Sequence, residues 1–465
     1  MASTEFKPGC LAAAGMMALL VNLSQAAVTA EEAGQLGVSL TEFGAEKTGN
    51  ADGSIPAYTG GLEKVAGYNP KTSNQYVDPF KGEKPLYSVT AENIAQYDAL
   101  LAPGTKTLIK TYPDFRIDVY PSHRSVRYTP GVLQNTIKNA TTVKLAGAVE
   151  GDTVEGADKG NLPYAGIPFP VPKNGYEVMW NNTFRFSAAV NQFSGTALMI
   201  DSAGNAGEPT TAKVFWVHPW YDTKGTLRGQ TFDSLFGFTT VVTSPPKIAG
   251  AGYLGYYLID TSLGQKAWYY TPGQRRIRPA PDFAYDMLMS GAIYWDELAG
   301  FSGRMDRFDF KLVGKKEMLV PYNVFGVTNT IMTKDFAGKK FVNPDAVRWE
   351  KHRMWIVDSV RKPAASHAYA RRTFYIDEDC WCITQTEAYD AAGKILRVAL
   401  INSFPSYVIG GINVNSWTNY DFVKGGYYVF NAGQADEGHE IRDYETAEGL
   451  QLALNPQAIV GKSTQ

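Results

Sequence analysis

The later two-thirds of the chain consists of short runs rich in aromatic and β-branched residues, each bounded by Gly, Pro or Asp. From about Glu177 onward these runs include AKVFWVHPWYD, QKAWYYTPGQRRIRPAP, DRFDFKLVGKKEMLVPYN and KHRMWIVDSVRK. Such residues favour strands, because rings and branched side chains pack well on a pleated surface. Aromatic residues make up 13% of the sequence, which leaves large apolar faces to bury. The pattern predicts a mainly β fold with some helices, of the α+β class, in which a curved antiparallel sheet wraps around an apolar space.

Residues 371–398, RRTFYIDEDCWCITQTEAYDAAGKILRV, indicate how three neighbouring strands connect. The acids at 377–379 are expected to form a tight connection, so that Ile376 pairs with Trp381. We interpret these acids as ordinary turn residues at a hairpin tip, because the Gly and the distant Glu of a calcium loop are missing. Side-chain alternation then places four apolar residues on one face: Phe374, Ile376, Trp381 and Ile383.

The second connection in this segment is expected to be a three-residue hairpin loop. Gly393 supplies the positive φ that such a loop needs. Asp390 should then face Lys394, and Glu387 should face Arg397 as a cross-strand ion pair. The same register puts Leu396 and Val398 on the face opposite Trp381, so either both faces are covered or a bulge switches the phase.

Cys380 and Cys382 are the two cysteines that follow the N-terminal segment. On an extended strand their Cα atoms would be about 6.6 Å apart, near the upper limit for a disulfide. The pair could therefore be a strained, easily reduced disulfide, a soft-metal site or a purely structural pair. No third cysteine or neighbouring histidine completes a metal or redox set.

No catalytic residue, metal site or cofactor is predicted from the remaining motifs. The histidines show no ligand spacing; they are His123, His218, His352, His367 and His439. GAGYLG at 250–255 has the letters of a dinucleotide motif without its strand–turn–helix context, and GFSGR at 300–304 falls short of a nucleophile elbow.

The chain has 44 Lys and Arg against 46 Asp and Glu, so no basic field invites nucleic acid. Residues 1–26 are predicted to be a secretory signal peptide, because Lys7 precedes an apolar run at 11–21 and small residues surround a cleavage position after Ala26. Cys10 lies before that run, where a lipid-anchoring cysteine is not expected. We expect export without an anchor.

Residues 27–160 are predicted to form an N-terminal strap and helices that cover the sheet. GAEKTGNADGSIPAYTGGL at 44–62 has no period and should lie as an irregular strap. Helices are expected over 91–101 with Thr90 as cap, over 106–110, and over 130–145. Residues 161–465 are assigned to the antiparallel sheet, and 27–465 is treated as one folded unit.

Several blocks of the chain resemble a known family. GAEKTGNADGSIPAYTGG, VYPSHRSVRYTP, GIPFPVPKNGYEVMWN, YYTPGQRRIRPAPDFAYD and YARRTFYIDED follow one another as in the bacterial domain-of-unknown-function 1329 family. That family is grouped with proteins similar to LolA and LolB, so the resemblance implies an open antiparallel half-barrel with a helical lid. Cys380 and Cys382 depart from the residues usual in relatives, and Asn182 replaces a common His.

The resemblance implies a periplasmic carrier for lipids or other hydrophobic molecules. Its ligand would be a hydrophobic small molecule or an acyl chain, held in a groove for which we predict seven residues: Trp268, Tyr270, Trp355, Phe374, Ile376, Trp381 and Ile383. Two alternatives stay open. One is an adaptor that works with an RND/MMPL-type transporter and an outer-membrane protein, and the other is an enzyme acting on lipids or esters.

Overall fold

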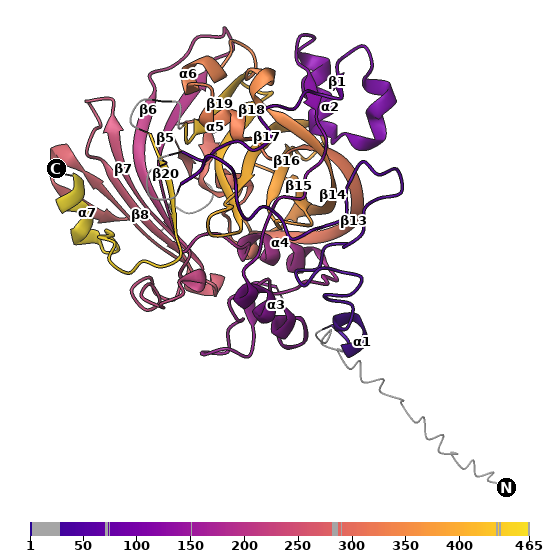
Figure 1. Ribbon diagram of the computed structural model, residues 1–465. Coiled ribbons are helices and arrows are strands. Elements are labelled where there is room, and N and C mark those ends of the chain that lie inside the picture. Colours follow the sequence, from indigo (N-terminus) through magenta and orange to yellow (C-terminus); the bar gives the residue numbers. More distant parts are fainter. Residues whose placement is uncertain are drawn as a thin grey trace.

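The computed structural model describes Met1 and residues 28–69, 73, 75–149, 151–280, 287–289, 291–433, 436 and 439–463. Apart from Met1, the predicted signal peptide lies outside the described residues. The described part is mainly β, with short helices, as the sequence predicts (Figure 1). Among its helices, none combines the length and apolar character needed to cross a bilayer.

One sheet of sixteen strands organises the molecule. Its strands follow one another in this spatial order: β1 (Tyr87–Val89), β2 (Ile117–Val119), β14 (Arg348–Arg361), β15 (Arg371–Asp377), β16 (Ile383–Tyr389), β17 (Ile395–Pro405), β18 (Ile412–Asp421), β19 (Gly426–Asn431), β5 (Val190–Ile200), β6 (Thr210–Val217), β7 (Phe236–Ser244), β8 (Gly252–Tyr257), β9 (Gln265–Thr271) and β10 (Arg276–Pro279). In addition, β13 (Phe308–Pro321) pairs with β14, and β20 (Ile441–Tyr444) pairs with β5. The pairs are antiparallel except β14 with β2. The order starts at β1 and ends at β10 without returning, so the sheet is open.

Two small hairpins and seven short α-helices accompany this sheet in the described residues. The hairpins are β3 (Lys144–Ala146) with β4 (Thr153–Glu155), and β11 (Leu288–Met289) with β12 (Ile293–Tyr294). The helices are α1 (Ala30–Ala33), α2 (Pro103–Thr111), α3 (Pro130–Thr142), α4 (Gly175–Thr183), α5 (Phe325–Asn329), α6 (Thr333–Phe336) and α7 (Pro456–Ser463).

The helix predictions are confirmed in part. Helix α3 begins at Pro130, as expected, and α2 extends the predicted 106–110 helix back to Pro103. The helix predicted over 91–101 is instead a 3₁₀ helix, Ile94–Leu100, preceded by Asn93. Strands were expected from about Glu177, but that residue lies in α4. Strands β1 and β2 come from the region expected to supply only strap and helices.

Both faces of the sheet are apolar and covered around β14–β18. On one face, Phe374 and Ile376 belong to the largest buried cluster. On the other face, Val398 and Leu400 pack in a second cluster with Leu108 of α2. The pairing also shifts between Ala388 and Tyr389. The sequence left two explanations open for apolar residues on both faces: either both faces are covered, or a bulge switches the phase. Both apply here, because both faces are covered and the register is irregular.

The other section of the sheet, β5–β9, is covered on its outer side by the C-terminal helix. Leu254, Tyr256 and Tyr270 pack with Ile459 of α7 in a third buried cluster. Figure 1 shows α7 beside β7 and β8, while the orange strands β13–β18 lie on the opposite side of the molecule. The inner face of β5–β8 is thus free to line the interior.

The predicted hairpins are corrected at two points. Ile383, not Trp381, lies opposite Ile376, and Trp381 has a φ of 54°. The loop at Gly393 is confirmed, with a φ of 81° and a backbone hydrogen bond from Asp390 to Lys394. Glu387, however, lies opposite Val398, so the predicted ion pair with Arg397 is wrong.

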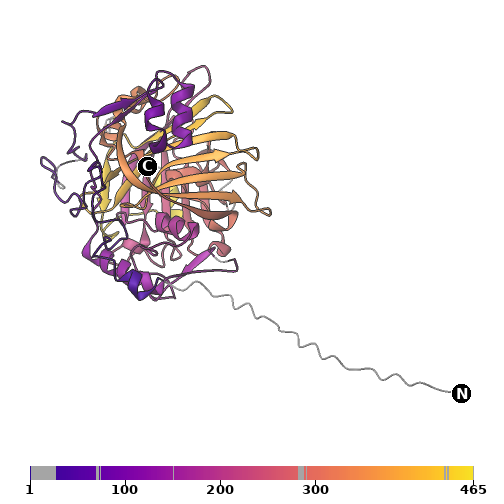
Figure 2. The same cartoon turned by 90° about the vertical axis from the view of Figure 1, so that its right-hand side faces the viewer.

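The strap predicted at 44–62 is confirmed as irregular chain that crosses other structure. Figure 2 shows the indigo N-terminal segment running along one side of the sheet. It is held tightly at Gly44, whose φ is +94° and where an added Cβ would lie 1.8 Å from the carbonyl oxygen of Pro170. The carbonyl of Phe43, the residue before Gly44, accepts a hydrogen bond of 2.9 Å from the Trp381 indole.

This contact gives a matched pair of variants. Gly53 also has a positive φ, +74°, but an added Cβ there meets nothing within 4 Å. We expect Gly53→Ala to lower the free energy of unfolding by about 1 kcal/mol, the cost of a left-handed non-glycine residue. Gly44→Ala should lower it by about 2 kcal/mol more, because the backbone of Pro170 must move. Urea denaturation of both variants measures the difference, and equal losses would contradict this close approach.

Candidate functional site

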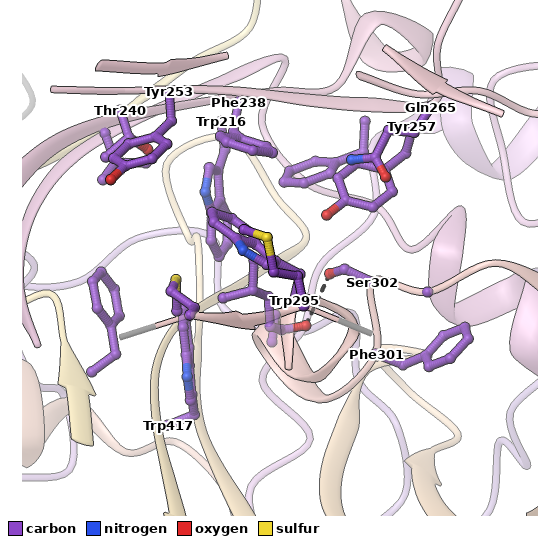
Figure 3. Close-up of a pocket in the computed structure, with 18 of the residues that line it drawn as sticks. Trp216, Phe238, Thr240, Tyr253, Tyr257, Gln265, Trp295, Phe301, Ser302 and Trp417 are labelled. Atoms are coloured by element: carbon purple, nitrogen blue, oxygen red, sulfur yellow. Dashed lines mark hydrogen bonds between the residues drawn. The ribbon is translucent and has the colours of Figure 1, made fainter. Parts of the chain in front are cut away.

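A cavity of about 310 Å³ lies against the inner face of β5–β8. Alternate residues of β6 and β7 line it because side chains point to one face at every second position. The aromatic residues that these two strands contribute are Trp216, Phe236 and Phe238. Strand β8 adds Tyr253 and Tyr257, and Figure 3 shows Phe238 between these two tyrosines along one wall.

The opposite side of the pocket is formed by the segment that includes residues 287–289 and 291–305. Trp295 of this segment stacks on Phe238, with ring centroids 5.7 Å apart and planes 17° apart. In Figure 3, Trp295 lies in the middle of the pocket, between the wall and Trp417 of β18. Trp295 therefore divides the space between two sections of the sheet.

Two buried carboxylates hold this segment in place. Asp296 accepts a hydrogen bond of 2.8 Å from Arg372, and Glu297 accepts one of 3.1 Å from Arg397. Tyr369 also donates to Glu297 at 2.9 Å. Burial opposes the charge of Asp296, but the Arg372 guanidinium holds the pKa of that carboxyl below its usual value. Paired in this way, the carboxylates fix Trp295 over the pocket.

The lining is mainly apolar, with a few polar groups near the end of α4. Arg185 is 9% exposed, and its Nη1 donates to the carbonyl of Asn182 at 2.9 Å. Burial lowers the pKa of Arg185 to about 10, so it stays charged at neutral pH. Burial and the charge of Arg185 lower the pKa of His218 to about 3, and its Nδ1 bonds to the carbonyl of Ala188. The Ser302 hydroxyl donates to the carbonyl of Leu298.

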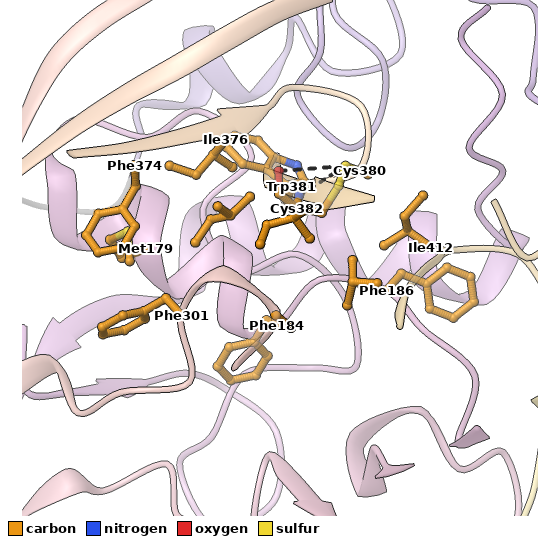
Figure 4. Close-up of a cluster of buried hydrophobic side chains, with 14 of the residues drawn as sticks. Met179, Phe184, Phe186, Phe301, Phe374, Ile376, Cys380, Trp381, Cys382 and Ile412 are labelled. Atoms are coloured by element: carbon orange, nitrogen blue, oxygen red, sulfur yellow. Dashed lines mark hydrogen bonds between the residues drawn. A yellow bond between two sulfur atoms is a disulfide. The ribbon is translucent and has the colours of Figure 1, made fainter. Parts of the chain in front are cut away.

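The seven side chains predicted for the groove lie elsewhere. Trp268 and Tyr270 are on the face of β9 that packs toward α7. Four others are fully buried in the largest cluster: Phe374, Ile376, Trp381 and Ile383. Figure 4 shows the first three of them in the cluster that also contains Met179, Phe184 and Phe301. Trp355 is half-buried and stacks on Trp381 with centroids 6.1 Å apart. None of the seven lines the pocket described above, and their role in binding stays a prediction.

The residues that do line the pocket had a weak sequence signal. The alternation in AKVFWV and FGFTT marks one face of β6 and β7, but it does not say whether that face is packed or hollow. Trp295 comes from a stretch with no strand pattern, and its position depends on the ion pairs of Asp296 and Glu297 and on its own stacking against Phe238.

Asp377 ends β15, and Glu378 and Asp379 lie in the turn to β16, as predicted, but these acids are not ordinary turn residues. Their exposed fractions are 0%, 2% and 1%. Arg124 donates to Asp379 at 2.6 Å, while Lys315 and Arg353 pair with Glu378 at 2.5 and 3.2 Å. The sequence did not reveal this, because Arg124 is more than 250 positions away. These contacts join the chain between β2 and α3, and also β13 and β14, to the turn.

Cys380 and Cys382 form a disulfide in the same turn, with Cα atoms 5.1 Å apart. The expected separation of about 6.6 Å assumed an extended strand. The positive φ of Trp381 shortens it, because the chain turns between the two cysteines. Both cysteines are buried.

His352, Asp377 and Asp379 meet closely enough to suggest a metal site, with ligand atoms within 4.8 Å of one another. His352 is enclosed by Glu350 at 3.1 Å and Asp377 at 3.3 Å. Burial alone would lower the pKa of His352, but Asp377 and Glu350 outweigh it and raise the pKa to about 10. The imidazole lies between two carboxylates, so we interpret this group as an ionic cluster.

A family model described as "Protein of unknown function (DUF1329)" matches residues 88–459. The chain belongs to this family. Uncharacterized protein PA3922 of Pseudomonas aeruginosa is 34% identical to this DUF1329 protein over 449 residues, which is 92% of each chain.

Three solved structures share part of the fold. The putative outer membrane lipoprotein-sorting protein domain of Vibrio parahaemolyticus has 12% identity and a TM-score of 0.42, over 62% of this chain and 98% of its own. A DUF1329 family protein of Desulfovibrio piger has 13% identity and a TM-score of 0.42, over 61% and 97%. The LolA superfamily protein NE2245 of Nitrosomonas europaea has 9% identity and a TM-score of 0.35, over 56% and 91%.

The ionic cluster predicts a pH dependence of stability. Folded His352 keeps its proton up to about pH 10, whereas the unfolded chain loses it near pH 6.5. Its contribution is therefore complete below about pH 6.5 and disappears as the pH rises toward 10, with a slope of up to about 1.4 kcal/mol per pH unit. Urea denaturation between pH 6 and 9.5 should show a shallower decline for His352→Gln than for the wild type. Identical slopes would contradict a protonated His352.

Proposed function

We propose that this DUF1329 protein is a binding and carrier protein for a lipid or another hydrophobic molecule, held in the pocket beneath Trp295. The observation that carries the proposal is an aromatic-lined space of about 310 Å³ against the inner face of β5–β8. Removing apolar surface from water stabilises a complex by roughly 25 cal/mol per Å², so such a lining binds apolar molecules without further chemistry.

In this proposal the bent sheet acts as a half-barrel of the LolA and LolB type. Its two sections hold the ligand between them, and the segment that carries Trp295 serves as the cover. The pocket lining begins at Trp180, so α1, α2 and α3 contribute no side chain to it. The lid function expected of the N-terminal helices is therefore reassigned to the segment anchored by Asp296 and Glu297.

We place the protein in the periplasm. The signal pattern at 1–26 supports this location, and so does the disulfide between Cys380 and Cys382, because disulfides persist in oxidising compartments. Binding is favoured over catalysis, because the Ser302 hydroxyl and the His218 ring are each bonded to backbone carbonyls rather than to one another.

Filling the pocket tests the proposal. Ala212 lines the cavity on β6, whereas its neighbour Lys213 is exposed on the other face of the strand. We expect Ala212→Trp to weaken binding of the apolar dye N-phenyl-1-naphthylamine about tenfold or more, because the indole occupies the space of the dye. Lys213→Trp should bind the dye as the wild type does. Fluorescence titration measures both.

Native mass spectrometry of the purified protein gives an independent readout of lipid that copurifies with it. The proposal fails if the wild type binds no dye, or if Ala212→Trp folds normally and binds the dye with unchanged affinity.

A further inference from the structure

Arg185 is a buried cation without a counterion. It lines the pocket and is 9% exposed, yet no carboxylate of the described residues lies within ion-pair distance of its guanidinium. Other buried arginines of this protein are paired. Arg124 has Asp379, Arg372 has Asp296, and Arg397 has both Glu297 and Asp421.

Burial of an unpaired charge is costly, and proteins usually neutralise such a group with a carboxylate. The apolar pocket around Arg185 strengthens this cost, because aromatic walls do not replace the water that a guanidinium loses. An anion that enters the pocket would form an ion pair with this buried guanidinium and offset the cost of its burial.

The hydrogen bonds of Arg185 leave one side of the guanidinium available. Its Nη1 donates to the carbonyl of Asn182, in the last turn of α4, and this bond orients the side chain. Within the described residues, Nε and Nη2 make no hydrogen bond. These two nitrogens form the edge that binds a carboxylate or a phosphate through two parallel hydrogen bonds.

The neighbouring histidine does not compete for an anion. The Nδ1 of His218 bonds to the carbonyl of Ala188, and the ring is neutral at physiological pH because its pKa lies near 3. A neutral His218 adds no second positive charge beside Arg185, and Arg304, which also lines the pocket, is already paired with Asp306 at 2.7 Å. The free edge of Arg185 therefore matches an anionic head group, either a carboxylate or a phosphate.

We propose that Arg185 is the head-group site of the pocket, and that the ligand is an amphiphile with an apolar body and an anionic head, either a carboxylate or a phosphate. This inference rests on the proposed binding function and specifies its ligand class. The aromatic lining holds the body, while the Nε–Nη2 edge of Arg185 holds the head.

Three probes with the same fourteen-carbon chain test the proposal: tetradecanoate, tetradecyl phosphate and tetradecan-1-ol. Their affinities are measured at pH 7.5 by displacement of N-phenyl-1-naphthylamine from the wild type, from Arg185→Met and from Arg276→Met. Arg276 is an exposed residue of β10, so its variant is a control for the loss of one positive charge.

In the wild type and in Arg276→Met, at least one of the two anionic probes should bind about tenfold or more tightly than tetradecan-1-ol. This is the gain in affinity expected from a charge-assisted hydrogen bond. Arg185→Met should bind the alcohol as before and lose this preference. A stronger effect for tetradecanoate assigns the site to a fatty acid, and a stronger effect for tetradecyl phosphate assigns it to a phosphate head group.

A preference that persists in Arg185→Met overturns the proposal, and so does a wild type that binds all three probes equally. A wild type that binds no probe overturns the binding function as well, so the two failures are distinct. If Arg185 only supported the end of α4, Arg185→Met would have a lower melting temperature and an unchanged preference. We expect instead that Arg185→Met has a higher melting temperature and loses the preference, because the variant removes an unpaired buried charge. Should Arg185→Met not fold, Arg185→Gln replaces it.

Discussion

The structure depends on one constraint, which is that both faces of a long open sheet are apolar and must be covered. Around β14–β18, one face packs into the central cluster and the other lies against the N-terminal helices. Around β5–β9, α7 covers the outer face. The inner face of β5–β8 is covered less completely, by the segment that carries Trp295. The pocket lies where this cover leaves space.

Buried charges position the covering segments rather than simply stabilising them. Asp296 and Glu297 reach arginines on β15 and β17, and this fixes Trp295 between the two sections of the sheet. At the turn between β15 and β16, Arg124 and Asp379 join the N-terminal region to the strands in the same way. A buried ion pair gains little net stability, but it penalises every arrangement in which one partner is left alone. Such pairs therefore specify how the covers attach.

Arg185 stands apart from these pairs. It is buried like Arg372 and Arg397, but none of the carboxylates that the structure describes lies beside it, and it faces the pocket instead of a cover. The contrast within a single chain separates two uses of a buried guanidinium. Where the partner is built in, the charge fixes the fold, and where the partner is missing, the charge is available to a ligand.

The sequence by itself determined the local features of this protein. Ring and β-branched residues between turn residues gave the strands, Pro130 gave the start of α3, Gly393 gave a hairpin loop, and the aperiodic residues 44–62 gave the strap. Each of these follows from neighbouring residues.

Alternation also showed that strand faces were apolar, but not which face would be filled by packed side chains. That depends on segments distant in the chain: α7 covers Tyr270, and the segment of Trp295 leaves a space beside Trp216. The burial of Asp377 and the missing partner of Arg185 were likewise decided only by the tertiary structure, because a charge is paired or unpaired according to what packs against it.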